Sequence, residues 1–303
     1  MKSPLWFCAL LLCFLLAGCA HQELPPETTL PPETTAAPTT EPTTVPTTQP
    51  IITGWVEENG ERYYYNEEGI PVTGWLELDG TTYYFRDDGT MATGEVIIDG
   101  TPCHFTSQGK RVIMVNPWNY VPADYAPDLV SLTSAHGVQG SLVDSSCYEA
   151  LTAMIDDCNK VCPQAYVVSS YRTHQQQVDN YNRKVRYYMD QGYGEETAKK
   201  EAATIIAIPG TSEHQLGLAV DIIDTRLWAL EWEQADLPAQ KWLMEHCWEY
   251  GFILRYPKDK IGVTGIIYEP WHYRYVGKEL AAELHELDLT LEEYIHAMTD
   301  AVG

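Results

Sequence analysis

The sequence predicts an α+β domain preceded by a module of short β-hairpins. A stretch that begins at Gly54 repeats itself every 20 residues, and each unit contains an Asn-Gly or Asp-Gly pair typical of tight hairpins. After Val115, short apolar strand patterns are scattered among helical patterns without regular β-α-β alternation, which is typical of the α+β class. Together with the N-terminal patterns, these features divide the chain into residues 1–18, 19–50, 51–113 and 114–303.

The composition is that of a globular chain with a strong acidic excess. Of the 303 residues, 45% are hydrophobic, which is enough to build a sizeable core. The formal net charge is −24, and a charge of this sign disfavours nucleic acid or an anionic membrane surface as a partner. The charge does not identify a substrate, because acidic surfaces also keep secreted proteins soluble.

Residues 1–18 have the pattern of a lipoprotein signal peptide. The apolar run Leu5–Leu16 is too short to span a bilayer as a stable helix. Residues 16–19, LAGC, resemble a bacterial lipobox, in which Cys19 becomes the first mature residue and carries lipid. We therefore expect the protein at the extracellular face of the cell membrane, with the lipid as its membrane contact. The alternative is an ordinary secretory peptide cleaved near Ala20.

Residues 19–50 are predicted to be a disordered tether. Between Glu23 and Pro50, proline and threonine occupy 18 of 28 positions, and such a segment cannot bury enough apolar surface to fold. Its prolines favour extended polyproline II, so its reach approaches about 90 Å at roughly 3.1 Å per residue. We interpret the segment as a spacer. A more specific interpretation is that it carries a lipid-anchored domain from the membrane out to the cell wall.

Residues 51–113 contain three 20-residue units, which start at Gly54, Gly74 and Gly94. The first two units begin with Gly-Trp, and all three carry an Asn-Gly or Asp-Gly pair, at least one aromatic residue and a second turn glycine. The paired turn residues favour type I′ turns, which need positive φ. We expect each unit to be a hairpin whose aromatic face is buried only by stacking on a neighbour.

These units resemble the choline-binding or cell-wall-binding repeats of Gram-positive surface proteins. The resemblance implies cages in which aromatic side chains of successive hairpins hold a quaternary ammonium group by cation–π attraction. The third unit departs from the pattern, because Glu95 replaces the tryptophan while Cys103 and His104 replace the paired tyrosines. At most one complete cage can form, so binding of choline-bearing or other wall polymers and a purely structural spacer both stay open. The aromatic residues that match the family are Trp55, Tyr64, Trp75 and Tyr84.

Residues 114–303 begin with an extended, proline-punctuated segment and continue as mixed helices and strands. Hydrophobic periodicity and end signals predict helices over Asp144–Val161, His174–Gln191, Glu195–Ile206 and Asp236–Tyr250, with two more helices closing the chain. Strands are expected over Ala165–Ser169, Leu218–Ile223, Phe252–Arg255 and Tyr268–Tyr275.

Five cysteines follow the N-terminal segments, and the sequence does not determine their pairing. A disulfide is permitted outside the cell, but the number is odd. The absence of any C-x-x-C pair argues against a zinc site built from cysteines. These residues are Cys103, Cys147, Cys158, Cys162 and Cys247.

A histidine and an aspartate seven residues apart, joined by a distant histidine, have the composition of a catalytic metal site. His214 and Asp221 lie in the stretch GTSEHQLGLAVD, and His272 ends the stretch EPWH. Two histidines and a carboxylate leave one position open on a tetrahedral zinc ion, as in catalytic sites. Glu269, three residues before His272, is placed to take and return protons. Each residue alone has a structural reading, as a core histidine, a turn residue or a surface ion pair.

Three separated motifs together resemble the VanY-type D-alanyl-D-alanine carboxypeptidases, zinc peptidases of the D,D- and L,D-carboxypeptidase group. The motifs are Ser170-Tyr171-Arg172 with Gln177, Ser212-x-His214-x6-Asp221, and Glu269-x-Trp271-His272-x-Arg274-Tyr275, all within about Met114–Leu287. The resemblance implies a hedgehog/D,D-peptidase-like fold, with a small sheet flanked by helices, and Zn2+ as cofactor. It implies that His214, Asp221 and His272 are the zinc ligands.

The same resemblance implies roles for the polar residues around the metal. Glu269 matches the catalytic carboxylate, and Arg172 matches an arginine that stabilises the developing oxyanion or binds a carboxylate. Gln177 and Ser212 match positions that hold the C-terminal end of the peptide. A salt-bridge role for Arg172 and a solvated helix position for Gln177 are the structural alternatives.

The function implied is removal of the terminal D-alanine from peptidoglycan stem peptides, in a Gram-positive cell wall. A D,D-carboxypeptidase, which removes the fifth residue of a pentapeptide, is favoured over an L,D-carboxypeptidase acting on tetrapeptides, which shares the metal motifs. The alternative of another class is a non-catalytic cell-wall-binding surface lipoprotein. The presence of Glu269 argues against that alternative, because a protein that only binds peptide has no need of a proton-transfer carboxylate.

Overall fold

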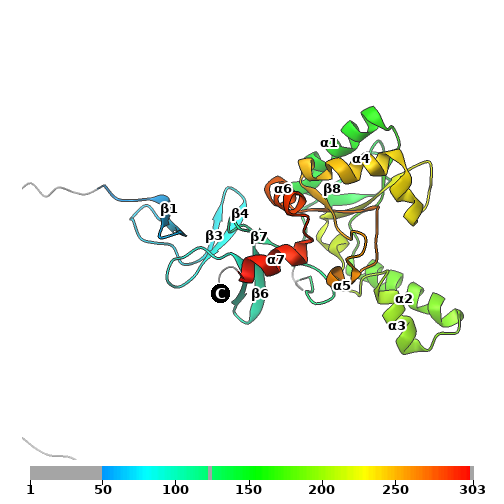
Figure 1. Ribbon diagram of the computed structural model, residues 1–303, viewed down its shortest axis with the longest axis horizontal. Coiled ribbons are helices and arrows are strands. Elements are labelled where there is room, and N and C mark those ends of the chain that lie inside the picture. Colours follow the sequence, from blue (N-terminus) through cyan, green and yellow to red (C-terminus); the bar gives the residue numbers. More distant parts are fainter. Residues whose placement is uncertain (1–49, 122–124, 301–303) are drawn as a thin grey trace, which may run out of the picture. The chain divides into compact units, whose positions relative to one another are not determined.

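The computed structural model describes residues 50–121 and 125–300 of the 303-residue chain (Figure 1). The chain from Pro50 onward forms one compact unit. The predicted signal peptide, the lipidation site Cys19 and the tether up to residue 49 lie outside the described residues.

The repeat units form three successive antiparallel hairpins, the third with an added strand. The strands are β1 (Gly54–Glu58), β2 (Glu61–Tyr65), β3 (Gly74–Leu78), β4 (Thr81–Phe85), β5 (Gly94–Ile98), β6 (Thr101–Phe105) and β7 (Arg111–Val112). In the first turn, Asn59 and Gly60 have φ values of 55° and 82°, and the equivalent pairs of the other two turns also have positive φ. The predicted hairpins and their turn geometry are therefore confirmed.

Aromatic side chains connect each hairpin to the next. The Trp55 ring lies 5.1 Å from the Tyr83 ring and 5.9 Å from the Phe85 ring of the second unit. Trp75 makes the equivalent contact with Phe105 of the third unit, at 6.0 Å between ring centroids. Phe85 and Phe105 are fully buried. The expected burial of each aromatic face against a neighbouring unit is thus observed.

The third hairpin carries an ion pair where the first two carry an aromatic pair. Glu95 and His104 face each other across β5 and β6, with 3.1 Å between Glu95 Oε2 and His104 Nε2. Trp55–Tyr64 and Trp75–Tyr84 occupy the same cross-strand positions in the other units. The two residues that depart from the repeat pattern are therefore cross-strand partners, and the buried His104 has the Glu95 carboxylate as its hydrogen-bond partner.

The third hairpin also contacts the C-terminal helix. The backbone N–H of Glu95 donates to Thr299 Oγ1 at 2.9 Å, and the N–H of Ser107 donates to the Tyr294 hydroxyl at 2.9 Å. Glycine is required at position 94, because a Cβ there would lie 2.7 Å from the Thr299 nitrogen. The third unit thus joins the repeats to the following domain.

The C-terminal domain alternates helices, 3-10 helices (η) and short strands, as the predicted α+β class requires. Its elements are β8 (Leu129–Ser131), β9 (Leu142–Asp144), α1 (Ser145–Val161), β10 (Ala165–Ser169), α2 (His174–Asp190), α3 (Glu195–Ala203), η1 (Glu213–Leu216), β11 (Ala219–Asp224), η2 (Trp232–Asp236), α4 (Pro238–His246), η3 (Cys247–Tyr250), β12 (Phe252–Leu254), α5 (Ile261–Thr264), β13 (His272–Tyr275), α6 (Lys278–Leu287) and α7 (Leu291–Asp300).

Most predicted elements are present, and their ends differ where a local signal was stronger than the hydrophobic period. The helix expected from Asp236 begins at Pro238, since proline fits the first helical turn, and continues beyond His246 only as a 3-10 turn. The strand expected from Tyr268 begins at His272, because the preceding residues form a turn. At the start of α1, Asp144 Oδ1 accepts from the Ser146 N–H at 3.0 Å, as the sequence suggested.

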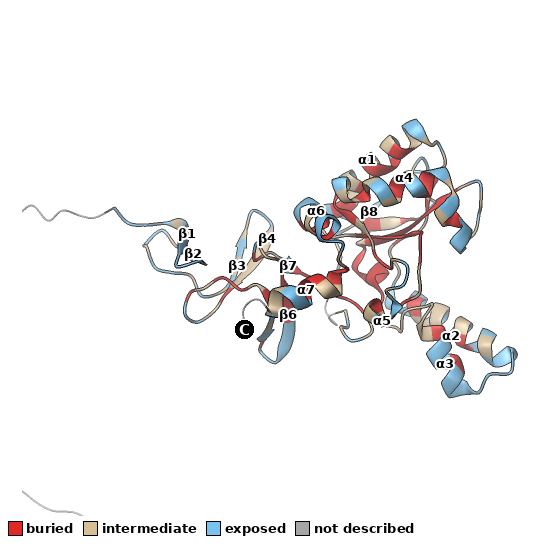
Figure 2. Ribbon diagram, viewed as in Figure 1, coloured by how far each residue is buried: buried red, intermediate tan, exposed pale blue. Residues whose placement is uncertain are grey.

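A four-stranded antiparallel sheet, in the order β10-β11-β13-β12, forms the centre of this domain. Alternate residues of β11 and β13, namely Val220, Ile222 and Tyr273, belong to a core shared with α1 and α4. Because side chains alternate across a strand, the intervening Asp221 and His272 point to the opposite face. Figure 2 shows buried residues along the strands and on α1 and α4.

A second core joins the end of the repeat module to the last two helices. Its buried members are Val112, Met114, Leu280, Leu284, Leu291, Tyr294 and Ile295. The chain that leaves the hairpins is therefore packed into the C-terminal domain and is not a free linker.

The described cysteines are all free thiols. Cys147, Cys158 and Cys247 lie in the core beneath the sheet, and burial raises the pKa of each thiol to about 12. In the ranges 50–121 and 125–300, no helix is long and apolar enough to cross a membrane.

The glycine that opens each hairpin provides a matched test of the contact with α7. Gly74 and Gly94 have φ of 77° and 67°, so Gly→Ala at either position costs about 1–2 kcal/mol of backbone strain. Only at Gly94 does the new Cβ collide with backbone, so Gly94→Ala should lose about a further 1–3 kcal/mol. Urea unfolding of the two variants measures this difference, and equal losses would mean that the third hairpin does not pack on α7 in solution.

Candidate metal centre

Two adjacent strands bring Asp221 and His272 together. The two residues are direct partners in the antiparallel register of β11 and β13, although 51 positions separate them in the sequence. Cross-strand partners have neighbouring Cβ atoms on the same face of a sheet. The imidazole Nδ1 of His272 lies 3.1 Å from Asp221 Oδ1.

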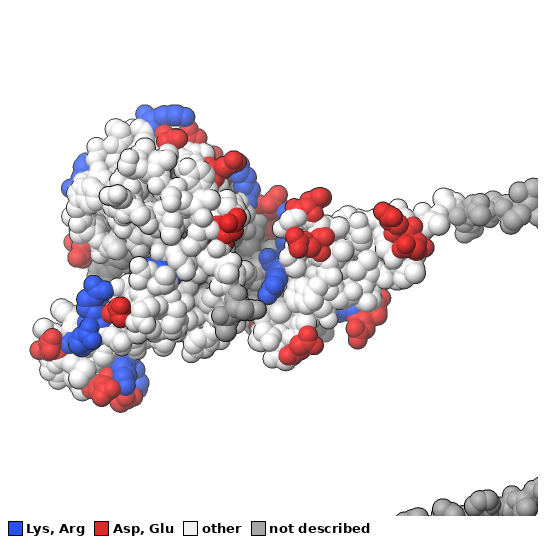
Figure 3. Space-filling model, turned by 180° about the vertical axis from the view of Figure 1, so that it is seen from behind, with Lys and Arg blue, Asp and Glu red and all other residues white. Residues whose placement is uncertain are grey.

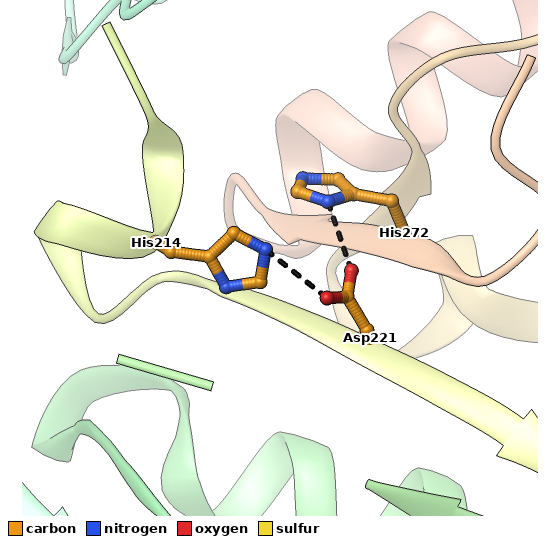
Figure 4. Close-up of side chains that lie close together, drawn as sticks. All are labelled: His214, Asp221 and His272. Atoms are coloured by element: carbon orange, nitrogen blue, oxygen red, sulfur yellow. Dashed lines mark hydrogen bonds and ion pairs between the residues drawn. The ribbon is translucent and has the colours of Figure 1, made fainter. Parts of the chain in front are cut away.

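The 3-10 helix η1 brings in the other histidine. His214 lies in its first turn, and Gly217, with φ of 74°, ends the turn and leads into β11. A side chain at Gly217 would lie 2.9 Å from the Asp144 nitrogen, so the tight turn requires glycine. His214 Nε2 lies 3.4 Å from Asp221 Oδ2, as Figure 4 shows.

The three side chains form a compact group of possible metal ligands. One ligand atom from each of His214, Asp221 and His272 lies within 4.8 Å of the others, and all three residues are buried. The sequence prediction that these residues share one site is therefore matched by their positions.

The hydrogen bond of His214 identifies its free lone pair. Its Nδ1 lies 2.8 Å from the Ser170 carbonyl oxygen, which can only accept, so Nδ1 carries the proton. Burial, together with the nearby Arg172 guanidinium, lowers the pKa of His214 to about 4, so the ring is neutral and Nε2 is an acceptor. This atom faces the Asp221 carboxylate without a hydrogen-bond partner. Two buried acceptors that face each other require a cation between them.

Asp221 is ionised, and its histidine neighbours are the reason. Burial opposes the charge, but contacts with His214 and His272 hold the pKa of Asp221 well below its usual range. Burial also opposes a charge on His272, whereas Asp221 and Glu213 raise its pKa to about 9. The acidic neighbours therefore favour a positive charge at this position, which a proton or a metal ion can supply.

Glu269 lies in the turn before β13, with its Oε2 atom 3.7 Å from His272 Nδ1. Burial raises the pKa of the Glu269 carboxyl to about 8, and Asp221 reinforces the increase, whereas His272 and Arg172 reduce it. A carboxyl group with a pKa near neutrality can both accept and return a proton. The position predicted for proton transfer is thus beside the candidate ligands.

Arg172 and Gln177 form a connected pair next to Asp221. Arg172 Nη2 lies 3.7 Å from Asp221 Oδ2, and its Nη1 donates to Gln177 Oε1 at 2.8 Å. Gln177 is fully buried, and its Nε2 donates to the Ala207 carbonyl at 2.6 Å. The sequence predicted a direct substrate contact for Gln177, and the structure shows that this side chain binds the Arg172 guanidinium.

A cavity of about 520 Å³ opens at these residues. Ser212 and Arg172 line it next to the candidate ligands, whereas Gln177 is not among the lining residues. Arg183, Lys184 and Tyr187 of α2 line another part. The size suits a ligand of several residues, and the lining combines cations, carboxylates and apolar surface.

Three residues for which no chemical role was predicted complete the site. Glu213 is a fully buried carboxylate next to His272, Arg255 holds Glu213, and the ring of Tyr256 lies 4.7 Å from the His272 ring. Glu213 stands directly before His214 in the motif, but its partners come from β13 and from the residue after β12, so only the fold reveals its role.

Comparison with known proteins identifies the domains that the geometry suggested. Residues 140–278 match the family of D-alanyl-D-alanine carboxypeptidases called VanY. Residues 72–113 match choline-binding repeats, and residues 53–70 match a cell wall binding repeat. The first match lies within the C-terminal domain, and the other two lie within the hairpins.

The chain is 40% identical over 185 residues to a D-alanyl-D-alanine carboxypeptidase of Enterococcus faecalis (strain ATCC 700802 / V583). The matched region covers 61% of this chain and 65% of that protein. A D-alanyl-D-alanine carboxypeptidase of Enterococcus faecium is 46% identical over 97 residues, 32% of this chain and 30% of that one. The chain thus spans less than two thirds of these curated relatives.

Two solved structures resemble the C-terminal domain. The vancomycin resistance D,D-pentapeptidase VanY in complex with Zn(II) is 40% identical with a TM-score of 0.54, over 60% of this chain and 97% of that one. The LD-carboxypeptidase LdcB is 32% identical with a TM-score of 0.55, over 67% of this chain and 94% of that one. Given this identity and coverage, the chain belongs to the VanY family of D-alanyl-D-alanine carboxypeptidases.

Proposed function

We propose that this protein is a zinc-dependent D,D-carboxypeptidase that removes the terminal D-alanine from peptidoglycan stem peptides. The observation that carries the proposal is the convergence of His214, Asp221 and His272 beside Glu269 on one cavity. Family membership supports the reaction class, and a relative of 40% identity has D-alanyl-D-alanine as its named ligand.

The three ligand residues fit a zinc ion. Ligands about 2.0–2.1 Å from a tetrahedral zinc ion lie roughly 3.3 Å from one another. The His214–Asp221 separation is 3.4 Å to Oδ2 and the His272–Asp221 separation is 3.1 Å to Oδ1, and one ligand atom from each residue lies within 4.8 Å of the others. When bound, the ion would act as a Lewis acid and make water a nucleophile at neutral pH.

The residues of the chain supply proton transfer and substrate positioning. Glu269, with a pKa near neutrality, takes a proton from the attacking water and returns it to the leaving amine. Arg172, fixed by Gln177, donates to the scissile carbonyl oxygen or to the terminal carboxylate of the peptide. Ser212 lines the cavity beside them and offers a further hydroxyl donor.

Cleavage of pentapeptides is favoured over cleavage of tetrapeptides by the comparisons. The D,D-pentapeptidase VanY is 40% identical to this chain, whereas the LD-carboxypeptidase LdcB is 32% identical. The metal motifs do not distinguish the two activities, so the direct test is chemical.

The purified protein should release one D-alanine from a pentapeptide stem, with a tetrapeptide as product seen by mass spectrometry. Glu269→Gln should retain zinc but lose about 10²–10⁴-fold in kcat, because proton transfer is removed while the three ligands stay. Exposed Glu286→Gln is the matched control and should match the wild type.

Loss of alanine only from tetrapeptides would make the protein an L,D-carboxypeptidase. A wild-type protein that holds no zinc and behaves like Glu269→Gln would support a wall-binding protein without catalysis.

We infer a location for the protein from residues 1–50, which lie almost wholly outside the described part. The lipobox-like residues 16–19 support a lipoprotein anchored at the extracellular face of the cell membrane. The Pro/Thr-rich residues that follow support a tether reaching into a Gram-positive wall. On the face shown in Figure 3, acidic and basic side chains are interspersed.

Metabolic labelling tests the anchor. A palmitate analogue should label the wild-type chain, and Cys19→Ala should abolish the label, because lipid is attached through this thiol. Cys8→Ala, within the predicted signal peptide, is the matched control and should keep the label. Equal labelling of Cys19→Ala and the wild type would exclude lipidation at this residue.

For the hairpins, we propose binding of wall polymers through the faces of Trp55 and Trp75. Both rings are partly exposed, and each forms an aromatic pair, with Tyr64 and Tyr84 respectively. The chain's own guanidinium groups already lie over both tryptophans, Arg62 at 4.6 Å and Arg111 at 5.0 Å from the ring centroids. An external ammonium group must therefore displace an internal cation.

Wild-type protein should be weakly retained on a choline resin, and Arg62→Ala with Arg111→Ala should be retained more strongly, since both ring faces become available. Adding Trp55→Ala and Trp75→Ala should abolish the gain. If the arginine variant is retained no better than the wild type, the hairpins are spacers or bind a ligand of another kind.

A further inference from the structure

A buried carboxylate oxygen and a buried imidazole nitrogen face each other behind the candidate metal centre. Glu213 Oε2 lies 3.6 Å from His272 Nε2, just beyond hydrogen-bond length. Among the described residues, neither atom has a hydrogen-bond partner. Buried polar atoms without partners are rare and costly, so two complementary ones at this distance indicate an interaction.

We propose that Glu213 is a positioning residue for the metal centre, which accepts a hydrogen bond from Nε2–H of His272 and thereby directs Nδ1 toward the metal. The inference rests on the zinc site proposed above. Both ring nitrogens of His272 face carboxylate oxygens, Nδ1 facing Asp221 and Nε2 facing Glu213. A metal ion bound at Nδ1 leaves the neutral ring one proton, which Nε2 then carries toward Glu213. Nδ1 is the nitrogen that lies beside Asp221 and Glu269.

Glu213 is held rigidly for this role. Its Oε1 atom accepts from Arg255 Nε at 2.8 Å and from Arg274 Nη1 at 2.9 Å. The two guanidinium groups hold the pKa of the Glu213 carboxyl well below its usual range, although burial opposes the charge. One oxygen is therefore committed to the arginines, and the other stays available for His272.

The arginines are fixed in turn by groups from distant parts of the chain. Arg255 makes a bidentate contact with Glu292 of α7, at 2.8 and 2.6 Å. Arg274 donates to the Ile113 carbonyl at 3.0 Å, directly after the last strand of the repeats. These contacts give Glu213 one position, as expected of a group that orients a ligand.

The two histidines are thus oriented by different acceptors. The Ser170 carbonyl binds Nδ1–H of His214 and exposes Nε2, whereas Glu213 binds Nε2–H of His272 and exposes Nδ1. A charged acceptor makes the opposite ring nitrogen more basic and strengthens its bond to a metal. His272 is accordingly the ligand that depends most on its partner.

The test compares Glu213→Gln with Glu292→Gln in the full chain. Both changes remove a carboxylate bound to Arg255, but Glu292 does not contact His272. Competition with a chromophoric chelator should give a zinc Kd raised about 10–100-fold for Glu213→Gln. The Kd of Glu292→Gln should rise by a much smaller factor, because Arg255 and Arg274 still bind Glu213 directly.

The proton on His272 supplies a second measurement that needs no variant. In 15N-histidine-labelled, zinc-loaded wild-type protein, long-range 1H–15N spectra should show a proton on Nε2 of His272 and on Nδ1 of His214. A proton on Nδ1 of His272 would overturn the proposal, and this result stands even if Glu213→Gln does not fold. An unchanged Kd for Glu213→Gln, or equal losses in both variants, would also overturn it.

These results separate the inference from the proposed activity. Zinc binding that depends on Glu213, in a protein that releases no D-alanine, would remove only the proposed reaction. A wild-type chain that binds no zinc would overturn both.

Discussion

Two hydrogen-bond acceptors face each other in the interior of this protein, and much of the C-terminal domain serves to hold them there. His214 Nε2 is an acceptor because the Ser170 carbonyl takes the proton on the other nitrogen, and Asp221 is ionised beside it. Acceptors repel one another at close range when buried, so the arrangement is stable only with a cation among them. A zinc ion is such a cation, and histidine nitrogens and carboxylate oxygens are among its usual ligands.

The sheet satisfies this constraint by separating apolar and polar chemistry onto its two faces. Val220, Ile222 and Tyr273 pack against α1 and α4, while the residues between them carry the site. A substitution on the apolar face therefore disturbs the ligands through the strand positions, without touching them. Asp221 and His272 are cross-strand partners on the other face, so the strands alone hold them side by side and no loop has to be ordered to do so.

The charges behind the site connect it to the far end of the chain. Glu213, Arg255 and Arg274 are buried beside the partly buried Glu292, and such a group is tolerated only because each charge is paired. Helix α7 supplies Glu292 and also contacts the third hairpin through Thr299. The repeat module is thus built onto the same helix that completes the environment of the metal centre.

The sequence by itself determined the features that depend on the type and local spacing of residues. Asn-Gly and Asp-Gly pairs specified hairpin turns, since few other residues accept positive φ, and the motifs around His214, Asp221, His272 and Glu269 specified a metal centre. Only the tertiary structure decided which atoms of those residues meet, that Gln177 supports Arg172, and that Glu213 faces His272. Strand register, burial and partners from α7 set these contacts, and they depend on residues far apart in the chain that no local pattern relates.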